Sequence, residues 1–262
     1  MMNCQLITLL CLVSGILATA PEIEKLVNDA GHLKELGVGR PMYSLEEMDG
    51  FPFTRLFFEN YARPLKPLIM KNAAKLSPAF EKWTDDYFLK LDEPPEHTIS
   101  IELKKKENRT FGVDDIAFKE FVRVYNESDI YMVNGIPPFI ASDVILPGPL
   151  QCESLLDTLI DAVMWFSSGG TKVDFTKYPG LAEIEYYKVI MEPGDCLYIP
   201  YKWIHHVRSD GSNIAVNIWW DHFEGLNANL DHCQDKFDPD MTMDKVTLKG
   251  FSGAMLSVAA IR

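Results

Sequence analysis

Two adjacent histidines, His205 and His206, are the residues of this sequence best suited to chemistry. They lie in the segment 191–220, which reads MEPGDCLYIPYKWIHHVRSDGSNIAVNIWW. A neutral imidazole is the commonest protein ligand of transition metals and can act as an acid or base near neutral pH. A histidine can also sit in a core with no chemical role, where a backbone carbonyl satisfies its ring N–H. The choice between these interpretations depends on the elements that position the pair.

Two predicted strands and a turn position the histidines. Residues 192–195, Glu-Pro-Gly-Asp, are typical of a tight turn, because proline presets φ and glycine tolerates positive φ. The apolar run 196–200 after the turn predicts a short strand, and the alternation in 214–220 predicts a half-buried one. Successive side chains on a strand point to opposite faces, so His205 and His206 are expected to face opposite ways.

The order of these landmarks resembles the C-terminal half of a JmjC (cupin-like) iron and 2-oxoglutarate oxygenase. The landmarks are a G-D turn, a strand ending in I-P, the W-x-H of Trp203 and His205, and the strand A-V-N-x-W. The resemblance implies that His205 is a ligand of Fe(II). It also implies that Asn217 lies near the 2-oxoglutarate cosubstrate, although a strand asparagine bonded to backbone is an equal alternative.

The first half of the chain resembles the same family. An aromatic segment, the strand 67–70 and a helix over 78–88 follow one another in the family's order. Further strands are predicted at 97–103 and 130–134, and helices at 22–36 and 116–125. In the second of these strands the resemblance makes Tyr131 a contact of 2-oxoglutarate, and a half-buried tyrosine with no such role is the alternative. The resemblance implies a mainly β (α+β) fold, a double-stranded β-helix core with flanking helices.

The sequence departs from the family at one place. In the family a segment like MWFSSGGTK leads into H-x-D, the motif that supplies the other two ligands of the iron. Here Lys172 is followed directly by Val173, and H-x-D occurs nowhere in the sequence. Asp174, His222 and Glu224 are the candidates to replace it. We therefore expect an incomplete core and no residue in an assigned catalytic role.

Three functions remain open on these grounds. The resemblance implies a protein hydroxylase of JmjC type that uses Fe(II) and 2-oxoglutarate, whereas the missing motif favours a catalytically impaired form of that scaffold. A non-enzymatic cupin-fold binding protein is the alternative. The expected partner is a protein, as substrate or ligand, whose identity the sequence does not specify. A net charge of −13 disfavours direct nucleic-acid binding, which needs a basic surface.

The N-terminal segment 1–20 predicts a signal peptide. Its apolar run Leu6–Leu17 precedes the small residues Ala-Thr-Ala and is too short for a membrane span of about 20 residues. Pro21 follows the expected cut, which leaves cleavage after Ala18 or retention of the segment as an anchor open. With this leader, the sequons at Asn108 and Asn126 predict a glycoprotein of the endoplasmic reticulum or the exterior.

The rest of the chain predicts one domain, 21–225, and an acidic, solvated tail, 226–262. Three cysteines lie outside the leader, Cys152, Cys196 and Cys233. This number allows at most one disulfide, such as Cys152 to Cys233, and is neither a disulfide framework nor a zinc site.

Overall fold

The computed structural model describes residues 5–12, 33–34, 37, 39–92, 97–103, 113–128, 130–168, 173–174, 179–182, 184–210 and 212–250. Every structural statement below concerns these residues. The sequon at Asn108 lies outside them. The helix expected over 22–36 also lies outside, except for Leu33–Lys34, which form the short strand β2 rather than helix.

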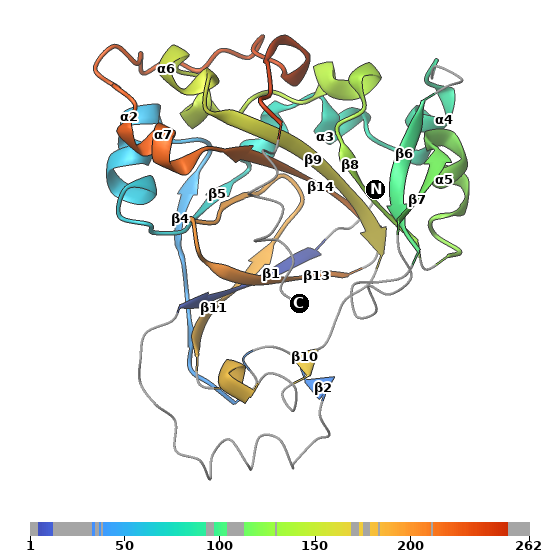
Figure 1. Ribbon diagram of the computed structural model, residues 1–262, viewed down its shortest axis with the longest axis horizontal. Coiled ribbons are helices and arrows are strands. Elements are labelled where there is room, and N and C mark those ends of the chain that lie inside the picture. The colour runs from blue at the N-terminus through green and yellow to red at the C-terminus, as the bar shows by residue number, and fades with distance from the viewer. Residues whose placement is uncertain are drawn as a thin grey trace.

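A five-stranded antiparallel sheet is the largest element of the fold (Figure 1). Its order is β14 (Ser212–Trp220), β9 (Leu159–Ser168), β8 (Tyr131–Gly135), β6 (Thr98–Glu102) and β7 (Val113–Ala117). The strands predicted at 130–134 and 214–220 are thus confirmed as β8 and β14. Alternation of apolar and polar residues predicted β14 and the strand at 97–103, found as β6, because one face of the sheet is buried.

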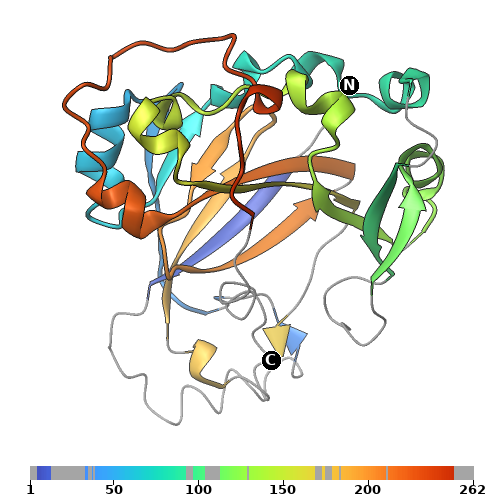
Figure 2. The same ribbon diagram turned by 45° about the horizontal axis from the view of Figure 1, so that its top comes forward.

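Three smaller sheets complete the β-structure. The first has the order β13 (Ile204–Asp210), β1 (Gln5–Leu12), β11 (Glu185–Met191) and β3 (Met42–Tyr43). The second has the order β12 (Cys196–Tyr198), β5 (Leu68–Lys71) and β4 (Glu46–Asp49), and the third pairs β10 (Val173–Asp174) with β2. In both ribbon views the sheet that contains β1 lies across from β9 and β14 (Figures 1 and 2).

Short helices cover the outer face of the five-stranded sheet (Figure 2). They are α2 (Thr54–Phe57), α3 (Ala79–Lys82), α4 (Asp85–Lys90), α5 (Phe118–Val124), α6 (Glu153–Leu156) and α7 (His222–Asn227). Short helical turns of other types occur at Phe58–Ala62, Ala73–Leu76, Pro138–Asp143, Gly148–Leu150, Pro179–Ala182 and Met243–Lys245. The predicted helix 78–88 is split into α3 and α4, because the side chain of Thr84 accepts a hydrogen bond from the amide of Tyr87 and starts a new helix.

Two apolar clusters join these helices to the sheet. One contains Phe58 of the Phe58–Ala62 turn, Leu155 of α6 and Leu159 of β9, and the other contains Phe88 of α4 and Met132 of β8. All five side chains have no exposed surface. The mixed fold of facing sheets and outer helices agrees with the architecture expected from the sequence.

The edge strands β12 and β14 belong to different sheets and pack on the same core, but the two strands do not pair with each other. Among the described strands, β14 pairs only with β9, and β12 pairs only with β5. Val216 and Ile218 of β14 and Tyr198 of β12 nevertheless pack against one cluster. Within the described ranges, the roll formed by the facing sheets, which corresponds to the expected double-stranded β-helix, is therefore not closed between β12 and β14.

The segment after α7 packs on the domain and is not a solvated tail. Leu230 and Met243 are each 5% exposed and belong to the core cluster of the helix layer. The side chain of Gln151 donates to the carbonyl of Asp238 at 2.9 Å and accepts from its amide at 2.8 Å. The prediction was wrong because it rested on the acidic composition of 226–250. The few apolar residues of this segment, such as Leu230 and Met243, are enough to pack it on the core.

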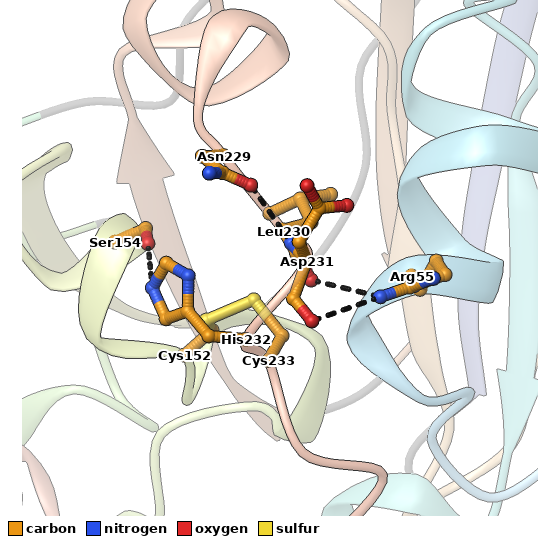
Figure 3. The surroundings of a disulfide bond; sticks show 8 residues. All are labelled: Arg55, Cys152, Ser154, Asn229, Leu230, Asp231, His232 and Cys233. Atoms are coloured by element: carbon orange, nitrogen blue, oxygen red, sulfur yellow. Dashed lines mark hydrogen bonds between the residues drawn. A yellow bond between two sulfur atoms is a disulfide. The ribbon is translucent and has the colours of Figure 1, made fainter.

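A disulfide between Cys152 and Cys233 fixes this segment to the helix layer (Figure 3). Beside it, Arg55 of α2 donates to the carbonyl oxygens of Leu230 and Asp231. The bridge that the sequence allowed is thus present in the structure. Cys196 is free, and burial raises the pKa of its thiol to about 12, so that it stays protonated near neutral pH.

In the described part of the chain, no helix is long and apolar enough to cross a membrane.

Candidate functional site

Tyr131 and Asn217 lie on the same face of the five-stranded sheet, opposite the helices. Val133 of β8 and Ala215 of β14 both pair with Trp165 of β9, so the odd-numbered residues of β8 and β14 share one face. The buried Met132 alternates with them and faces the helix layer. The two cosubstrate contacts expected from the sequence therefore both face inward, toward the sheet that contains β13.

His205 lies on β13 and faces the interior from the other side. Its backbone pairs with Leu10 of β1, which in turn pairs with Tyr187 of β11, so His205 and Tyr187 point to the same face of the sheet. Tyr187 packs on the small cluster of Ile69, Val189 and Met191, which joins this sheet to the three-stranded one. That face therefore looks into the space between the sheets.

The predicted turn at 192–195 holds the strands of this inner cluster in place. Gly194 has a φ of +96°, a backbone conformation that favours glycine. The carboxylate of Asp195 accepts hydrogen bonds from the side chain of Lys71, from the amide of Asn72 at 3.1 Å and from the amide of Glu192 at 2.9 Å. Its side chain is 2% exposed. Asp195 is thus a structural residue that ties the turn to the end of β5.

His205 itself is exposed, and its Nδ1 lies 3.3 Å from the carbonyl oxygen of Trp203. A bond from Nδ1–H to a carbonyl leaves Nε2 as the acceptor, a tautomer that suits a metal ligand. Three donors are nevertheless needed for the family's iron site. No cluster of three or more His, Cys, Asp or Glu side chains suited to a metal is found within the described part of the chain.

The side chains proposed to replace the missing ligands have other partners. The ring of His222, at the start of α7, stacks on Tyr201 with a centroid separation of 3.7 Å. Burial lowers the pKa of His222, with a smaller lowering by Lys202 and an opposing effect of Asp221. Glu224 forms an ion pair with Lys249 at 2.5 Å.

The third candidate, Asp174, pairs with Leu33 in the two-stranded sheet β10–β2, separate from the sheet of His205. The hypothesis that Asp174, His222 or Glu224 completes an iron site with His205 gains no support from this arrangement. Within the described residues, the side chains near His205 do not form a facial triad.

Tyr131 is 4% exposed, and its hydroxyl donates a hydrogen bond to the carboxylate of Glu102. Glu102 pairs with Tyr131 across β6 and β8, so both face inward. Asn217 is exposed on β14. Sequence reasoning missed Glu102, although the alternation of the strand 97–103 places it on the polar face.

Two surface hollows of the described residues lie away from this site. Both are shallow and meet near α2, one lined by Phe51, Phe53 and Phe237 among others, and one by Arg55, Glu59 and Asp235 among others. Neither is lined by His205, Tyr131 or Asn217.

The comparison with protein families agrees with this geometry. Residues 143–225 match the family described as the cupin-like domain, a span that includes His205 and Asn217 but not Tyr131. The chain carries a cupin-like domain. The relatives that it resembles include JmjC proteins.

Three of these relatives illustrate the similarity. The chain is 42% identical over 50 residues to Jumonji C domain-containing protein 5 of Drosophila melanogaster, covering 19% of this chain and 12% of that protein. It is 27% identical over 90 residues to the human bifunctional peptidase and (3S)-lysyl hydroxylase JMJD7, covering 32% and 28%. It is 22% identical over 268 residues to the tRNA wybutosine-synthesizing protein 5 of Gallus gallus, covering 76% and 82%. The match to the Drosophila protein thus spans only a small part of either chain.

The alignment with the chicken protein is longer than the whole chain of 262 residues. It therefore includes positions at which this chain has no residue.

Proposed function

We propose that this chain is a JmjC-type oxygenase scaffold of the secretory pathway that binds a protein partner and has little or no catalytic activity. The proposal rests on the positions and contacts of the candidate iron ligands. His205 faces the interior, as the family's distal ligand would, whereas His222 and Glu224 are held by Tyr201 and Lys249. A single imidazole does not fix the number and geometry of ligands that Fe(II) requires.

The cosubstrate side of the site is also altered. 2-Oxoglutarate carries two carboxylates, and the hydroxyl of Tyr131 is already bonded to the carboxylate of Glu102. A second carboxylate next to Glu102 would be repelled at low effective dielectric. Glu102 therefore lowers the affinity for 2-oxoglutarate, just as the incomplete ligand set lowers the affinity for Fe(II). These residues have no assigned reaction step.

An iron titration tests this proposal. The full chain should bind Fe(II) weakly by anaerobic calorimetry, and His205→Ala should leave the isotherm unchanged within error. His232→Ala is the matched control, because His232 is exposed and bonded to Ser154 beside the Cys152–Cys233 disulfide in the helix layer (Figure 3). Binding of one equivalent of Fe(II) that is lost in His205→Ala and kept in His232→Ala would refute the impaired-site proposal.

The non-enzymatic cupin-fold binding protein remains the second candidate. Glu102 favours it, because a carboxylate facing inward suits a neutral or cationic ligand better than 2-oxoglutarate. Ligand-observed NMR with 2-oxoglutarate distinguishes the two. Weak but saturable binding without turnover supports a silent oxygenase scaffold whose cosubstrate affinity Glu102 has lowered, and no binding supports the second candidate.

Two features support a place in the secretory pathway. Disulfides such as Cys152–Cys233 persist in oxidising compartments and are rare in the cytosol. Asn126 is exposed just after α5, where a glycan can be accommodated. Endoglycosidase treatment of chain made in mammalian cells should shift its gel mobility, and Asn126→Gln should reduce the shift. The exposed Asn60, which is outside any sequon, provides the control Asn60→Gln, and an unshifted wild-type chain would contradict the location.

The expected partner is a protein. One relative is named a lysyl hydroxylase, and the net charge of −13 disfavours nucleic acid. Crosslinking in intact endoplasmic reticulum followed by mass spectrometry is the experiment that identifies it.

A further inference from the structure

The strand that bears His205 is joined to its sheet through β1 alone. The order of this sheet is β13-β1-β11-β3, so among the described strands β13 has no ladder except the one with β1. β13 and β14 follow each other in the chain but lie in different sheets. The position of His205 therefore depends on residues at the far N-terminal end of the sequence.

The spacing of strands shows why β1 is needed. Neighbouring strands lie about 4.8 Å apart, so two strands on either side of a third are about 10 Å apart. A backbone hydrogen bond spans about 2.9 Å between N and O. Without β1, β11 and β13 could not bond to each other unless one of them moved.

The pairing of β1 is continuous on both sides. Residues 6–12 pair antiparallel with β11, and residues 5–11 pair antiparallel with β13. Thr8, in the middle, lies between Val189 and Val207. Val189 is 1% exposed, so this side of the ladder borders the inner cluster.

The sequence of β1 suits a central strand. QLITLLCL has no proline, glycine or charge, and a short apolar run of this length is consistent with a strand that is covered by neighbours. The same residues form the apolar part of the expected signal peptide. A molecule whose first 20 residues are removed has no β1, so the two roles exclude each other once cleavage has occurred.

We propose that Gln5–Leu12 is retained in the folded chain as a substitute strand, which occupies a strand position left by the block absent after Lys172. Two observations support this: β1 fills a gap between β11 and β13 in an otherwise incomplete roll, and the alignment with the chicken relative contains positions at which this chain has no residue. The inference goes beyond the proposed function. It is compatible with entry into the endoplasmic reticulum through an uncleaved targeting segment.

Engineered disulfides in the full chain test the register. In a Cys4→Ser/Cys11→Ser background, Thr8→Cys with Val207→Cys places two thiols opposite each other, whereas Ile7→Cys with Val207→Cys places them on opposite faces. After mild oxidation, the linked peptide should be at least about 10-fold more abundant for the first pair than for the second. Equal yields, or no link at Thr8, would overturn the proposal.

Two measurements on the unaltered chain do not depend on these variants. Amide hydrogen exchange of residues 5–12 should be at least about 100-fold slower than in a free peptide of the same sequence, because a central strand protects its amides. The intact mass of chain purified from the endoplasmic reticulum should include these residues. Free-peptide exchange rates, or a mass that starts after Leu12, would overturn the proposal. The glycan shift reports location independently, so the failure of one idea is distinguishable from failure of the other.

Discussion

The indole Nε1 of Trp83 donates a hydrogen bond to Oδ2 of Asp143, at 3.1 Å, in the layer of helices outside the main sheet. The same carboxylate accepts from Tyr87 at 2.5 Å and from Lys82 at 2.7 Å, and Asp143 is 2% exposed. These bonds link the segment of α3 and α4 to the chain that leads into the cupin-like domain. The link is independent of any metal.

Removal of this carboxylate should weaken the whole fold. Asp143→Ala leaves the indole of Trp83 and the phenol of Tyr87 without their acceptor. Each hydrogen bond to a charged group contributes about 1.5–3 kcal/mol to stability. We expect the free energy of unfolding, measured by urea titration, to fall by about 3 kcal/mol. Asp240→Ala, at an exposed position of the 226–250 segment, should change it by less than about 0.5 kcal/mol. Equal effects of the two variants would contradict this role of Asp143.

The same group predicts a pH dependence. Burial alone would raise the pKa of Asp143, but the hydrogen bonds from Lys82, Tyr87 and Trp83 outweigh burial and lower the pKa below its ordinary value of 3.8. Because the folded pKa is lower than the unfolded one, the stabilisation is complete above pH 3.8 and is lost as the pH falls through the folded pKa. Melting temperatures measured from pH 6 to pH 2 should fall more steeply for the wild-type chain than for Asp143→Asn. Parallel curves would show that this carboxylate is not responsible.

The disulfide should stabilise the chain by closing a long loop. Cys152 and Cys233 are 81 residues apart, and loops of this length correspond to about 4.5 kcal/mol, within a usual range of about 2–5 kcal/mol. Dithiothreitol should lower the melting temperature of the wild-type chain. The double variant Cys152→Ser/Cys233→Ser should melt at that lower temperature with or without the reductant. A wild-type melt that does not respond to reduction would contradict the predicted contribution.

Much of the β-structure could be predicted from the sequence, because it depends on local patterns. Alternation predicted β14 and β6, and the proline-glycine turn predicted the bend before β12. The strand β1 could not be predicted in this way. An apolar run of this kind is typical of a signal peptide as well as of a strand. The pairing of β1 with β11 and β13 also joins residues that are far apart in the chain.

The site was predictable only in part, for the same reason. Motif order predicted His205, Tyr131 and Asn217, and the register places all three on inward faces. The partner of Tyr131, Glu102, belongs to a different strand, and no local rule joins them. The ion pair of Glu224 with Lys249 likewise depends on the 226–250 segment folding back onto the domain, which its acidic composition did not indicate.

A succinate-release assay tests the central claim most directly. The full chain is incubated with Fe(II), ascorbate, 2-oxoglutarate and oxygen, and succinate is quantified by mass spectrometry beside the His205→Ala variant. We predict that wild type and variant both stay at the level of the protein-free control, because the donor set around His205 does not fit a facial triad. Succinate formed over many turnovers by the wild-type chain and abolished in His205→Ala would contradict the account.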